Sequence, residues 1–534
     1  MPRFDVNLFA KTVEKIREKA IAEGRLQHNP PDDVLEKITM KEEGVKRTRF
    51  GGLVAHGEPT SRAAVFTKNS VDNTFGQAEI DLLQQCESVL AEKKLISVDR
   101  VVGNFNSKTV VRLTVPEEFA HTAFGGKNLF AAPRGEVEKP DYEIVFFKDD
   151  GFERNKNKPL PEKDITIRLA MLEDGRVIKI VRNGNYIGEY KKGVFAAEDW
   201  VARTRRGGIF LHTGLREDYL QSVHGEYKTT RTLLAALSAN GKTTLSSKVL
   251  ARKGKEKSWL VQDDGGTLMP DGSFHGFEQG GIFVKTENVS PHDQLEIYYG
   301  LLKPGTFAEN VAVTEDGDFD FYNLEETANG RAVVKRQDFM HASQHIDVER
   351  IDNLILITRG PIIPAIARLT CEQAVAFMIL GQAMESSAGD PTRAGTIRSE
   401  FFYDPFMAGN KAEHANRLYD ILQGLPHMHF YLLNTGGIGE GTRYMDIRLE
   451  NTLGILDSLI RGGLEQDWME SISGLEVPAA VRVVDDIFFH PEIVYSRGEF
   501  EKRQTELNRF RRQAIEAVGD GLHPAIRKVF EHVR

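Results

Sequence analysis

An apolar segment that runs directly into a glycine–lysine–threonine turn constrains the fold more than any other part of the sequence. TLLAALS (232–238) has the composition of a buried strand, and NGKTTLSSKVL (240–250) has that of a helix beginning at a polar loop. Phosphate-binding loops need this strand–loop–helix order, because the free N–H groups and the positive dipole end of the helix then face the anion. The segment therefore predicts an α/β nucleotide-binding domain.

The loop between these two segments departs from the common G-x-x-x-x-G-K-[ST] pattern of phosphate loops. Ala236 stands at the first glycine position, and Ala239 and Asn240 stand where glycine and small residues are frequent. Asparagine tolerates the left-handed backbone region, and alanine adopts it at a cost of roughly 1 kcal/mol. Because this cost is small beside phosphate binding, the loop still predicts a nucleotide site. An ordinary strand-to-helix turn is the alternative interpretation.

Charged and hydroxyl groups around the loop match the needs of a magnesium–nucleotide complex. Gly241 is followed by Lys242, whose ammonium would contact the β- and γ-phosphates, and by Thr243, whose hydroxyl would contact Mg²⁺. Further along the chain, the apolar segment SWLVQDD ends in Asp263 and Asp264. A carboxylate at the end of such a strand commonly holds Mg²⁺ or its water shell. Because paired aspartates are also a common turn signal, the prediction depends on their combination with the loop.

The composition excludes several classes of protein. The chain has 534 residues and a formal net charge of −9, and without a basic stripe nucleic acid is not an expected partner. Its two cysteines, Cys86 and Cys371, lie far apart in the sequence, which argues against a disulfide scaffold and a cysteine zinc site. The charged N-terminus lacks the apolar core of a signal peptide, and no run of 18 apolar residues occurs. We therefore expect a cytoplasmic protein with no membrane-spanning segment.

Hydrophobic patterning predicts a mixed α/β fold of two domains. Helices are expected at 7–24, 77–94, 371–386, 412–423 and 498–518. Apolar or alternating segments predict strands at 96–105, 109–116 and 142–147, and from about residue 165 the pattern indicates short strands with glycine-rich turns. We expect a substrate-side N-terminal domain over 1–210 and a P-loop nucleotide-binding domain over 211–534.

Several longer motifs accompany the loop. NGNYIGEYKKGVF (183–195) and GGIFLHTGL (207–215) precede it, and FEQGGIFVKTENVSP (277–291), PGTFAENVAV (304–313) and FYLLNTGGIGEG (430–441) follow it. Taken in this order, the motifs resemble those of the ATP-dependent phosphoenolpyruvate carboxykinases, and the resemblance extends over most of the chain. It implies a two-domain phosphoenolpyruvate carboxykinase-like fold with a P-loop-containing C-terminal domain.

The resemblance implies a reaction and a metal site. Oxaloacetate and ATP would give phosphoenolpyruvate, CO₂ and ADP. Mn²⁺ would be bound by Lys192, His212 and Asp264, and Mg²⁺ would be held by Thr243 and Asp263. A lysine binds a metal only when it is neutral, so burial, the metal and neighbouring cations would have to depress its pKa. Outside this motif order, Lys192 would be interpreted as a solvated surface lysine and His212 as a core histidine at a strand end.

The resemblance also implies the residues that bind substrate and nucleotide. Arg62 in PTSRA would grip the substrate carboxylate, Tyr186 would lie beside the carboxylation site, and Ser238 would approach the substrate. Arg331 would neutralise charge on the transferred phosphoryl group, with Arg336 as the alternative. The residues implied for nucleotide binding are Ser238, Ala239, Asn240, Gly241, Lys242, Thr243, Thr244 and Arg331. The implied catalytic residues are Lys192, His212, Arg331, Lys242 and Asp264.

The sequence departs from the family pattern in segments that matter for function. The loop reads ALSANGKTT rather than GLSGTGKTT, QDDGGTL replaces GDDEHGW, and little remains of the substrate-binding FTGRSPKDK segment. AGDPTRAGT (388–396) resembles the family's lid, and an ordinary polar loop is the alternative. Three functions therefore stay open: the carboxykinase reaction, phosphorylation of a different small molecule on the same scaffold, and binding or regulation without turnover.

Overall fold

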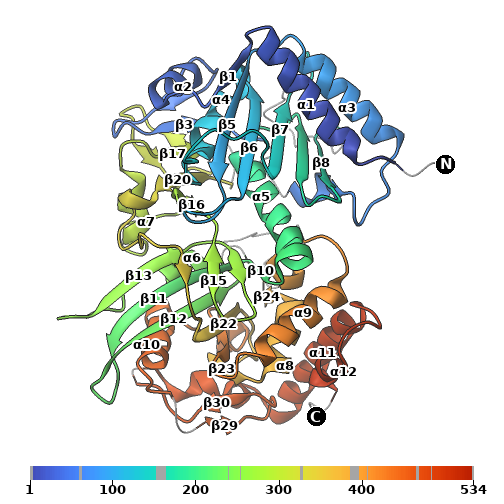
Figure 1. The fold of residues 1–534 in the computed structure, drawn as a ribbon. Coiled ribbons are helices and arrows are strands. Elements are labelled where there is room, and N and C mark those ends of the chain that lie inside the picture. Colours follow the sequence, from blue (N-terminus) through green and yellow to red (C-terminus); the bar gives the residue numbers. More distant parts are fainter. Residues whose placement is uncertain are drawn as a thin grey trace.

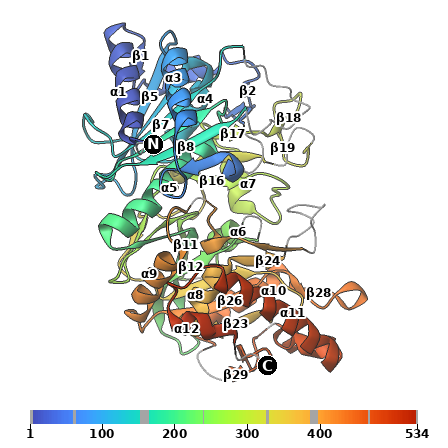
Figure 2. The same ribbon diagram turned by 90° about the vertical axis from the view of Figure 1, so that its right-hand side faces the viewer.

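The chain forms two lobes, with helix α5 (Ile187–Val201) between them (Figures 1 and 2). The computed structural model describes residues 4–58, 63–151, 164–237, 240–252, 254–324, 329–384, 396–405, 407–464, 468–482 and 484–531. The N-terminal residues lie in one lobe and the C-terminal residues in the other. None of the described helices is long and apolar enough to cross a lipid bilayer.

A seven-stranded mixed sheet forms the centre of the N-terminal lobe. Its strand order is β1-β5-β6-β7-β9-β8-β4. The bounds are Leu26–His28 for β1, Thr67–Asn69 for β4, Leu95–Val101 for β5, Val110–Pro116 for β6, Tyr142–Phe147 for β7, Thr166–Met171 for β8 and Val177–Arg182 for β9. Helices α1 (Asn7–Ala22) and α3 (Gln77–Leu90) pack on one face. Helices α4 (Ala120–Gly126) and α5 cover the other, so this sheet fixes the position of the YKKG motif on α5.

A second sheet, here called the shared sheet, takes strands from two distant parts of the chain. It contains β2 (Lys46–Arg47), β3 (Leu53–Ala55), β16 (Gly281–Lys285), β17 (Phe307–Glu309) and β20 (Arg331–Lys335). Strand β17 pairs in parallel with β3 and antiparallel with β20. In both views β16 and β17 accordingly lie beside the N-terminal lobe (Figures 1 and 2). The division at residue 210 stays a prediction, and this sheet takes strands from both sides of it.

An eight-stranded sheet forms the centre of the C-terminal lobe, in the order β13-β11-β12-β22-β26-β23-β30-β29. The bounds are Thr213–Gln221 for β11, Tyr227–Ala235 for β12, Lys257–Gln262 for β13, Asn353–Thr358 for β22, Ile366–Leu369 for β23, His429–Asn434 for β26, Trp468–Glu470 for β29 and Glu476–Pro478 for β30. One face is covered by α8 (Cys371–Leu380), α9 (Lys411–Gln423) and α12 (Pro524–Arg527). The other carries α6 (Lys242–Ser247) and α10 (Leu449–Ile460).

Smaller elements complete the fold. A four-stranded sheet in the order β10-β14-β15-β21 lies near α5; its strands are Ile209–Leu211, Gly266–Leu268, Phe274–Gly276 and Asp347–Val348. Three two-stranded sheets pair β18 (Ala312–Val313) with β19 (Phe319–Asp320), β24 (Gln382–Met384) with β25 (Ile397–Ser399) and β27 (Gly437–Ile438) with β28 (Met445–Asp446). The other helices are α2 (Asp32–Thr39), α7 (Leu295–Leu301) and α11 (Arg497–Glu516).

The structure confirms the mixed α/β class and most of the predicted elements, but it corrects two of them. The strand-rich pattern expected from residue 165 is wrong over Ile187–Val201, which form the buried helix α5. The helix expected over 371–386 ends at Leu380. Gly381 follows with a φ of +43°, and a Cβ there would lie 1.7 Å from the carbonyl oxygen of Glu400. Only glycine fits this approach, so the chain leaves the helix and forms β24.

A buried pair of titratable groups joins α5 to α9. The Oδ1 atom of Asp199 lies 3.6 Å from the Nδ1 atom of His414, and both side chains are almost completely buried. Burial raises the pKa of Asp199 to about 8; Asp404 also raises it, whereas Arg203 opposes the shift. Burial lowers the pKa of His414 to about 3. Both groups are therefore neutral in the folded protein near neutral pH.

Replacing Asp199 with asparagine should change how stability depends on pH. The folded pKa of about 8 lies above the usual 3.8. The stabilising contribution of the wild-type carboxyl group is therefore complete below the unfolded pKa and is lost as the pH rises toward the folded pKa. Relative to wild type, Asp199→Asn should gain up to about 1.4 kcal/mol per pH unit across this window. The lowered pKa of His414 changes the pH dependence of stability in the opposite direction. This contribution cancels in the comparison, because wild type and Asp199→Asn both contain His414.

Melting temperatures of wild type and Asp199→Asn between about pH 5 and pH 8 measure this difference. Asp33→Asn on the exposed face of α2 is the control and should follow the wild-type curve. Parallel curves for Asp199→Asn and wild type would contradict the prediction.

Candidate active site

Asp264 contacts two lysines and a histidine from three different parts of the chain. It follows β13. Its Oδ1 atom accepts a hydrogen bond from Lys242 at the start of α6 and lies 2.9 Å from the Nε2 atom of His212. Its Oδ2 atom lies 2.8 Å from the Nζ atom of Lys191 on α5. Burial opposes ionisation of Asp264, but Lys191, Lys242 and His212 hold its pKa well below the usual value. The carboxylate therefore stays ionised and links the predicted phosphate loop to the predicted metal ligands.

Asp263 lies beside Asp264 with a different environment. It is buried, and burial together with the charge of Asp264 raises its pKa, against the influence of Lys191, Lys242 and a hydrogen bond with Thr243. Among the described residues, its Oδ1 atom has no hydrogen-bond partner. A buried carboxylate oxygen without a hydrogen-bond partner is suited to contact a cation or a water molecule bound to one.

The second partner of Lys191 is a buried glutamate. The Nζ atom of Lys191 lies 3.0 Å from the Oε1 atom of Glu278, whose Oε2 atom accepts a hydrogen bond from Gln262 at 3.0 Å. Burial raises the pKa of Glu278 to about 7, although Lys191 opposes the shift. Sequence reasoning missed both Lys191 and Glu278. The signal was present in the KK pair, because adjacent residues on a helix point in different directions and have different partners.

A backbone carbonyl sets the orientation of His212. The Nδ1 atom lies 2.8 Å from the carbonyl oxygen of Tyr403, so Nδ1 carries a hydrogen and Nε2 faces Asp264. Without its own proton, Nε2 would place a lone pair against a carboxylate oxygen, so the pair requires either a proton or a cation between the two atoms. Phe402 and Tyr403 have positive φ angles of 53° and 57°, which are costly for residues other than glycine. Sequence patterns carry no signal for such a carbonyl.

Lys192 lies on a different side of α5 from Lys191. Its Nζ atom is 3.1 Å from the Oε1 atom of Glu189 and 5.4 Å from the centre of the Tyr186 ring. The other oxygen of Glu189 pairs with the buried Lys179 at 2.9 Å. Tyr186 is buried at the start of α5, and burial raises its pKa. Lys192 and Tyr186 therefore lie together; their roles as a metal ligand and as a carboxylation-site residue stay predictions.

The two candidate arginines have different environments. Arg331 on β20 donates to the carbonyl oxygen of Gly330 at 2.7 Å and lies 3.4 Å from Glu287, and its charge acts on Tyr186. Arg336 is buried and donates to the carbonyl oxygens of Val261, Ser343 and Glu278. Because Arg336 holds the backbone in place, Arg331 is the better candidate for contact with a ligand.

The described part of the predicted phosphate loop leads into α6 through a left-handed glycine. Gly241 has a φ of +93°, a left-handed backbone conformation that glycine adopts without strain. Asn240 does not have a positive φ. The carbonyl oxygen of Asn240 accepts a hydrogen bond from Thr435 at 3.1 Å, and the hydroxyl of Thr244 accepts one from Gln294 at 3.4 Å. The remaining predicted residues Arg62, Ser238 and Ala239, and the lid segment up to residue 395, lie outside the described residues.

Comparison with known proteins places these features in a family. The model of the phosphoenolpyruvate carboxykinase family matches residues 54–487, which is well over half of the chain. The chain belongs to this family. The carboxykinase is 27% identical over 507 residues to the phosphoenolpyruvate carboxykinase (ATP) of Aeropyrum pernix, with 94% of this chain and 96% of that one covered.

Two further relatives of this carboxykinase carry the same name. The protein of Christiangramia forsetii is 27% identical over 426 residues, which cover 76% of this chain and 74% of the relative. The protein of Mesorhizobium japonicum is 26% identical over 516 residues, which cover 88% and 91%. The three matches cover between 74% and 96% of the relatives' length.

The residues of this carboxykinase fit a divalent cation beside Asp264. Within the described ranges, no group of three or more histidine, cysteine, aspartate or glutamate side chains is placed to hold a metal. The set implied by the family is of another kind, because it combines one imidazole, one carboxylate and a lysine. The Nε2 atom of His212 and the Oδ1 atom of Asp264 face each other across 2.9 Å. Asp263 adds an oxygen that has no hydrogen-bond partner among the described residues. This set of nitrogen and oxygen donors suits a divalent cation.

Proposed function

We propose that the conversion of oxaloacetate and ATP to phosphoenolpyruvate, CO₂ and ADP takes place around Asp264. The observation that supports this most strongly is that one carboxylate pairs with both Lys242 of the phosphate loop and His212 of the predicted metal set. A nucleotide held by the loop would have its γ-phosphate beside that carboxylate. The acceptor of the phosphoryl group would then lie between α6 and α5.

The nucleotide would bind at the start of α6. Residues Ser238 to Thr244 would surround the phosphates, Lys242 would contact the β- and γ-phosphates, and Arg331 would offset charge on the transferred group. Mg²⁺ would be held by the Thr243 hydroxyl and by Asp263, directly or through water. These assignments rest on the order of the motifs and on the positions of the described members of the set.

The metal beside the substrate would be Mn²⁺, held by Lys192, His212 and Asp264. A bound divalent cation supplies positive charge next to an enolate oxygen. The hydrogen bond from His212 to the Tyr403 carbonyl keeps Nε2 directed at Asp264. Lys192 would have to leave Glu189 or share it with Lys179, which already neutralises one of the two oxygens.

The substrate would lie beside Tyr186 and Lys192, with Arg62 on its carboxylate. When the carbon–carbon bond to the departing carboxylate breaks, CO₂ leaves. The electron pair of the broken bond stays on the remaining three-carbon fragment and forms the enolate. The enolate oxygen then attacks the γ-phosphorus and ADP departs. Lys242 and Arg331 would offset the charge that moves with the phosphoryl group. We place the enzyme in the cytoplasm, where reducing conditions suit the free cysteines Cys86 and Cys371.

The test is an assay of the purified chain with oxaloacetate, ATP, Mg²⁺ and Mn²⁺, followed by phosphorus NMR. We expect phosphoenolpyruvate and ADP to appear in equal amounts together with CO₂, with ATP preferred over GTP. Formation of pyruvate and CO₂ without consumption of ATP would contradict phosphoryl transfer. Tight binding of MgATP without phosphoenolpyruvate would point to the other phosphoryl acceptor that the altered substrate segments leave open.

A further inference from the structure

Helix α6 carries the loop residues Lys242 and Thr243 but is only six residues long. A helix of this length is not stable on its own, so its position depends on the surface beneath it. That surface is β11, where glycine allows a close approach. A Cβ at Gly214 would lie 2.2 Å from the hydroxyl oxygen of Ser246. Arg216 and Asp218, two and four residues further along β11, have their side chains on the same face of the strand as Gly214.

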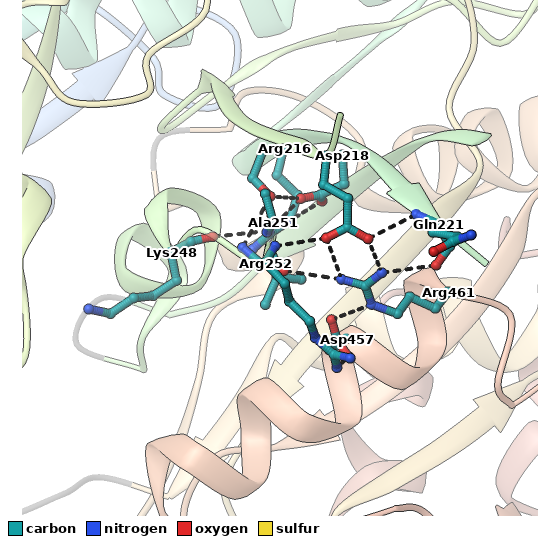
Figure 3. Close-up of polar contacts among 11 residues, drawn as sticks. Arg216, Asp218, Gln221, Lys248, Ala251, Arg252, Asp457 and Arg461 are labelled. Atoms are coloured by element: carbon teal, nitrogen blue, oxygen red, sulfur yellow. Dashed lines mark hydrogen bonds and ion pairs between the residues drawn. The ribbon is translucent and has the colours of Figure 1, made fainter. Parts of the chain in front are cut away.

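The first of these side chains, Arg216, holds the far end of α6. Its Nη1 atom donates to the carbonyl oxygen of Leu245, and its Nη2 atom donates to that of Lys248 at 3.0 Å. Its Nε and Nη2 atoms donate to the two carboxylate oxygens of Asp218, at 2.6 and 2.8 Å. Arg216 is 1% exposed and Asp218 is fully buried. The guanidinium is therefore fixed on β11 while it binds the carbonyls at the end of the helix (Figure 3).

Asp218 extends the contact to the segment that follows α6. Its Oδ1 atom accepts a hydrogen bond from the hydroxyl of Ser258 at 2.6 Å. The same hydroxyl oxygen accepts from the backbone N–H groups of Leu250 and Ala251, both at 3.1 Å. Arg216 and Asp218 thus fix the chain from the last turn of α6 to Ala251.

A second buried arginine provides a comparison. Arg461 at the end of α10 pairs with Glu256 and Asp457 and donates to the carbonyl oxygen of Leu250 at 3.2 Å (Figure 3). It resembles Arg216 in burial and in its paired carboxylates, but it contacts the chain beyond α6 rather than the helix itself. Arg216 contacts both α6 and the loop that follows it, whereas Arg461 contacts the loop, so a comparison of the two arginines isolates the support of the helix.

We propose that Arg216 is a positioning residue for nucleotide binding, which holds α6 so that Lys242 and Thr243 meet the phosphates. This inference rests on the proposed function. A bound polyphosphate attracts Lys242 and the N-terminal end of α6, and a displacement of about 1 Å in a positioning element costs up to about 100-fold in rate. Buried ion pairs add little net stability compared with apolar side chains. A guanidinium with a bidentate carboxylate instead gives a fixed geometry, and lysine cannot reproduce it.

The test compares Arg216→Lys with Arg461→Lys and with wild type. Dissociation constants for MgATP are measured by calorimetry without oxaloacetate, and KM values for ATP and for oxaloacetate are measured separately. We expect Arg216→Lys to raise the MgATP dissociation constant about 10-fold and to leave the oxaloacetate KM within about twofold. Arg461→Lys should lower the melting temperature to a similar extent but leave nucleotide binding unchanged.

Equal nucleotide affinities in the two variants would overturn the positioning role, and so would a parallel rise of both KM values in Arg216→Lys. If Arg216→Lys does not fold, Asp218→Asn weakens the pairing that fixes the Arg216 guanidinium and changes the side-chain shape less. In that variant we again expect the KM for ATP to rise while the KM for oxaloacetate stays near the wild-type value. Absence of MgATP binding and of phosphoenolpyruvate formation in wild type would contradict the proposed function itself. The two failures are therefore distinguishable.

Discussion

Replacing His212 with alanine should lower the rate of phosphoenolpyruvate formation roughly 100- to 1000-fold. The imidazole is the group that faces Asp264 across 2.9 Å while its other nitrogen is held by the Tyr403 carbonyl. Its loss removes one of the three implied ligands of Mn²⁺ and leaves the carboxylate to Lys191 and Lys242. Initial rates at saturating substrate measure the catalytic effect, and the free Mn²⁺ signal in electron paramagnetic resonance measures metal affinity without turnover.

The control for this experiment is His275→Ala. His275 lies on β15, 3.6 Å from Asp347, and its side chain is about half exposed. It also pairs with a carboxylate, but it does not share in the Asp264 cluster to which Lys242 and Lys191 belong. We expect its rate and Mn²⁺ affinity to match wild type. A His212→Ala enzyme with wild-type Mn²⁺ affinity would show that the metal lies elsewhere.

Replacing Lys191 with methionine should destabilise the fold by about 3–5 kcal/mol. The ammonium is buried between Asp264 and Glu278, so its removal leaves the fully buried Glu278 and the partly buried Asp264 without their shared cation. Burial already raises the pKa of Glu278 to about 7, so protonation of this group on mild acidification should restore part of the loss. Urea denaturation at neutral and mildly acidic pH measures both effects.

Lys192→Met provides the matched comparison within the KK pair. Lys192 is 29% exposed, and its partner Glu189 keeps the buried Lys179, so this variant should lose much less stability. Its activity should nevertheless fall, because Lys192 is an implied metal ligand. The double variant with Lys191→Met and Glu278→Gln should recover stability but not activity. Equal destabilisation by the two lysine variants would contradict the different roles inferred from their contacts.

The sequence predicted the parts of the site that depend on local patterns. The apolar segments before Gly241 and before Asp263 form β12 and β13, which pair with the two edges of β11. Lys242 and Asp264, which follow these strands, are in contact. The motif order also assigned His212 and Asp264 to one metal site; the two side chains lie 2.9 Å apart, and the metal site itself stays a prediction. These relations follow from the strand–loop–helix order and from the sequence of motifs, both of which can be read without coordinates.

The parts that escaped prediction depend on long-range packing. The rotation of α5 about its axis decides that Lys191, rather than Lys192, contacts Asp264, and that rotation is set by the sheet beneath it. The Tyr403 carbonyl meets His212 from 191 positions away, and a backbone group has no side-chain identity for a pattern to detect. The early end of α8 likewise depends on the approach of Gly381 to Glu400.

The shared sheet has a consequence for synthesis of the chain on the ribosome. Strand β3 ends at Ala55, but its partner β17 begins at Phe307 and the sheet is complete only at Lys335. At about 5–20 residues per second, the wait between these points is on the order of tens of seconds. During that interval β3 has an unpaired edge on the β17 side, and such edges pair readily with other chains. Nascent molecules would therefore depend on chaperones that shield this edge, and slower translation would prolong the exposure.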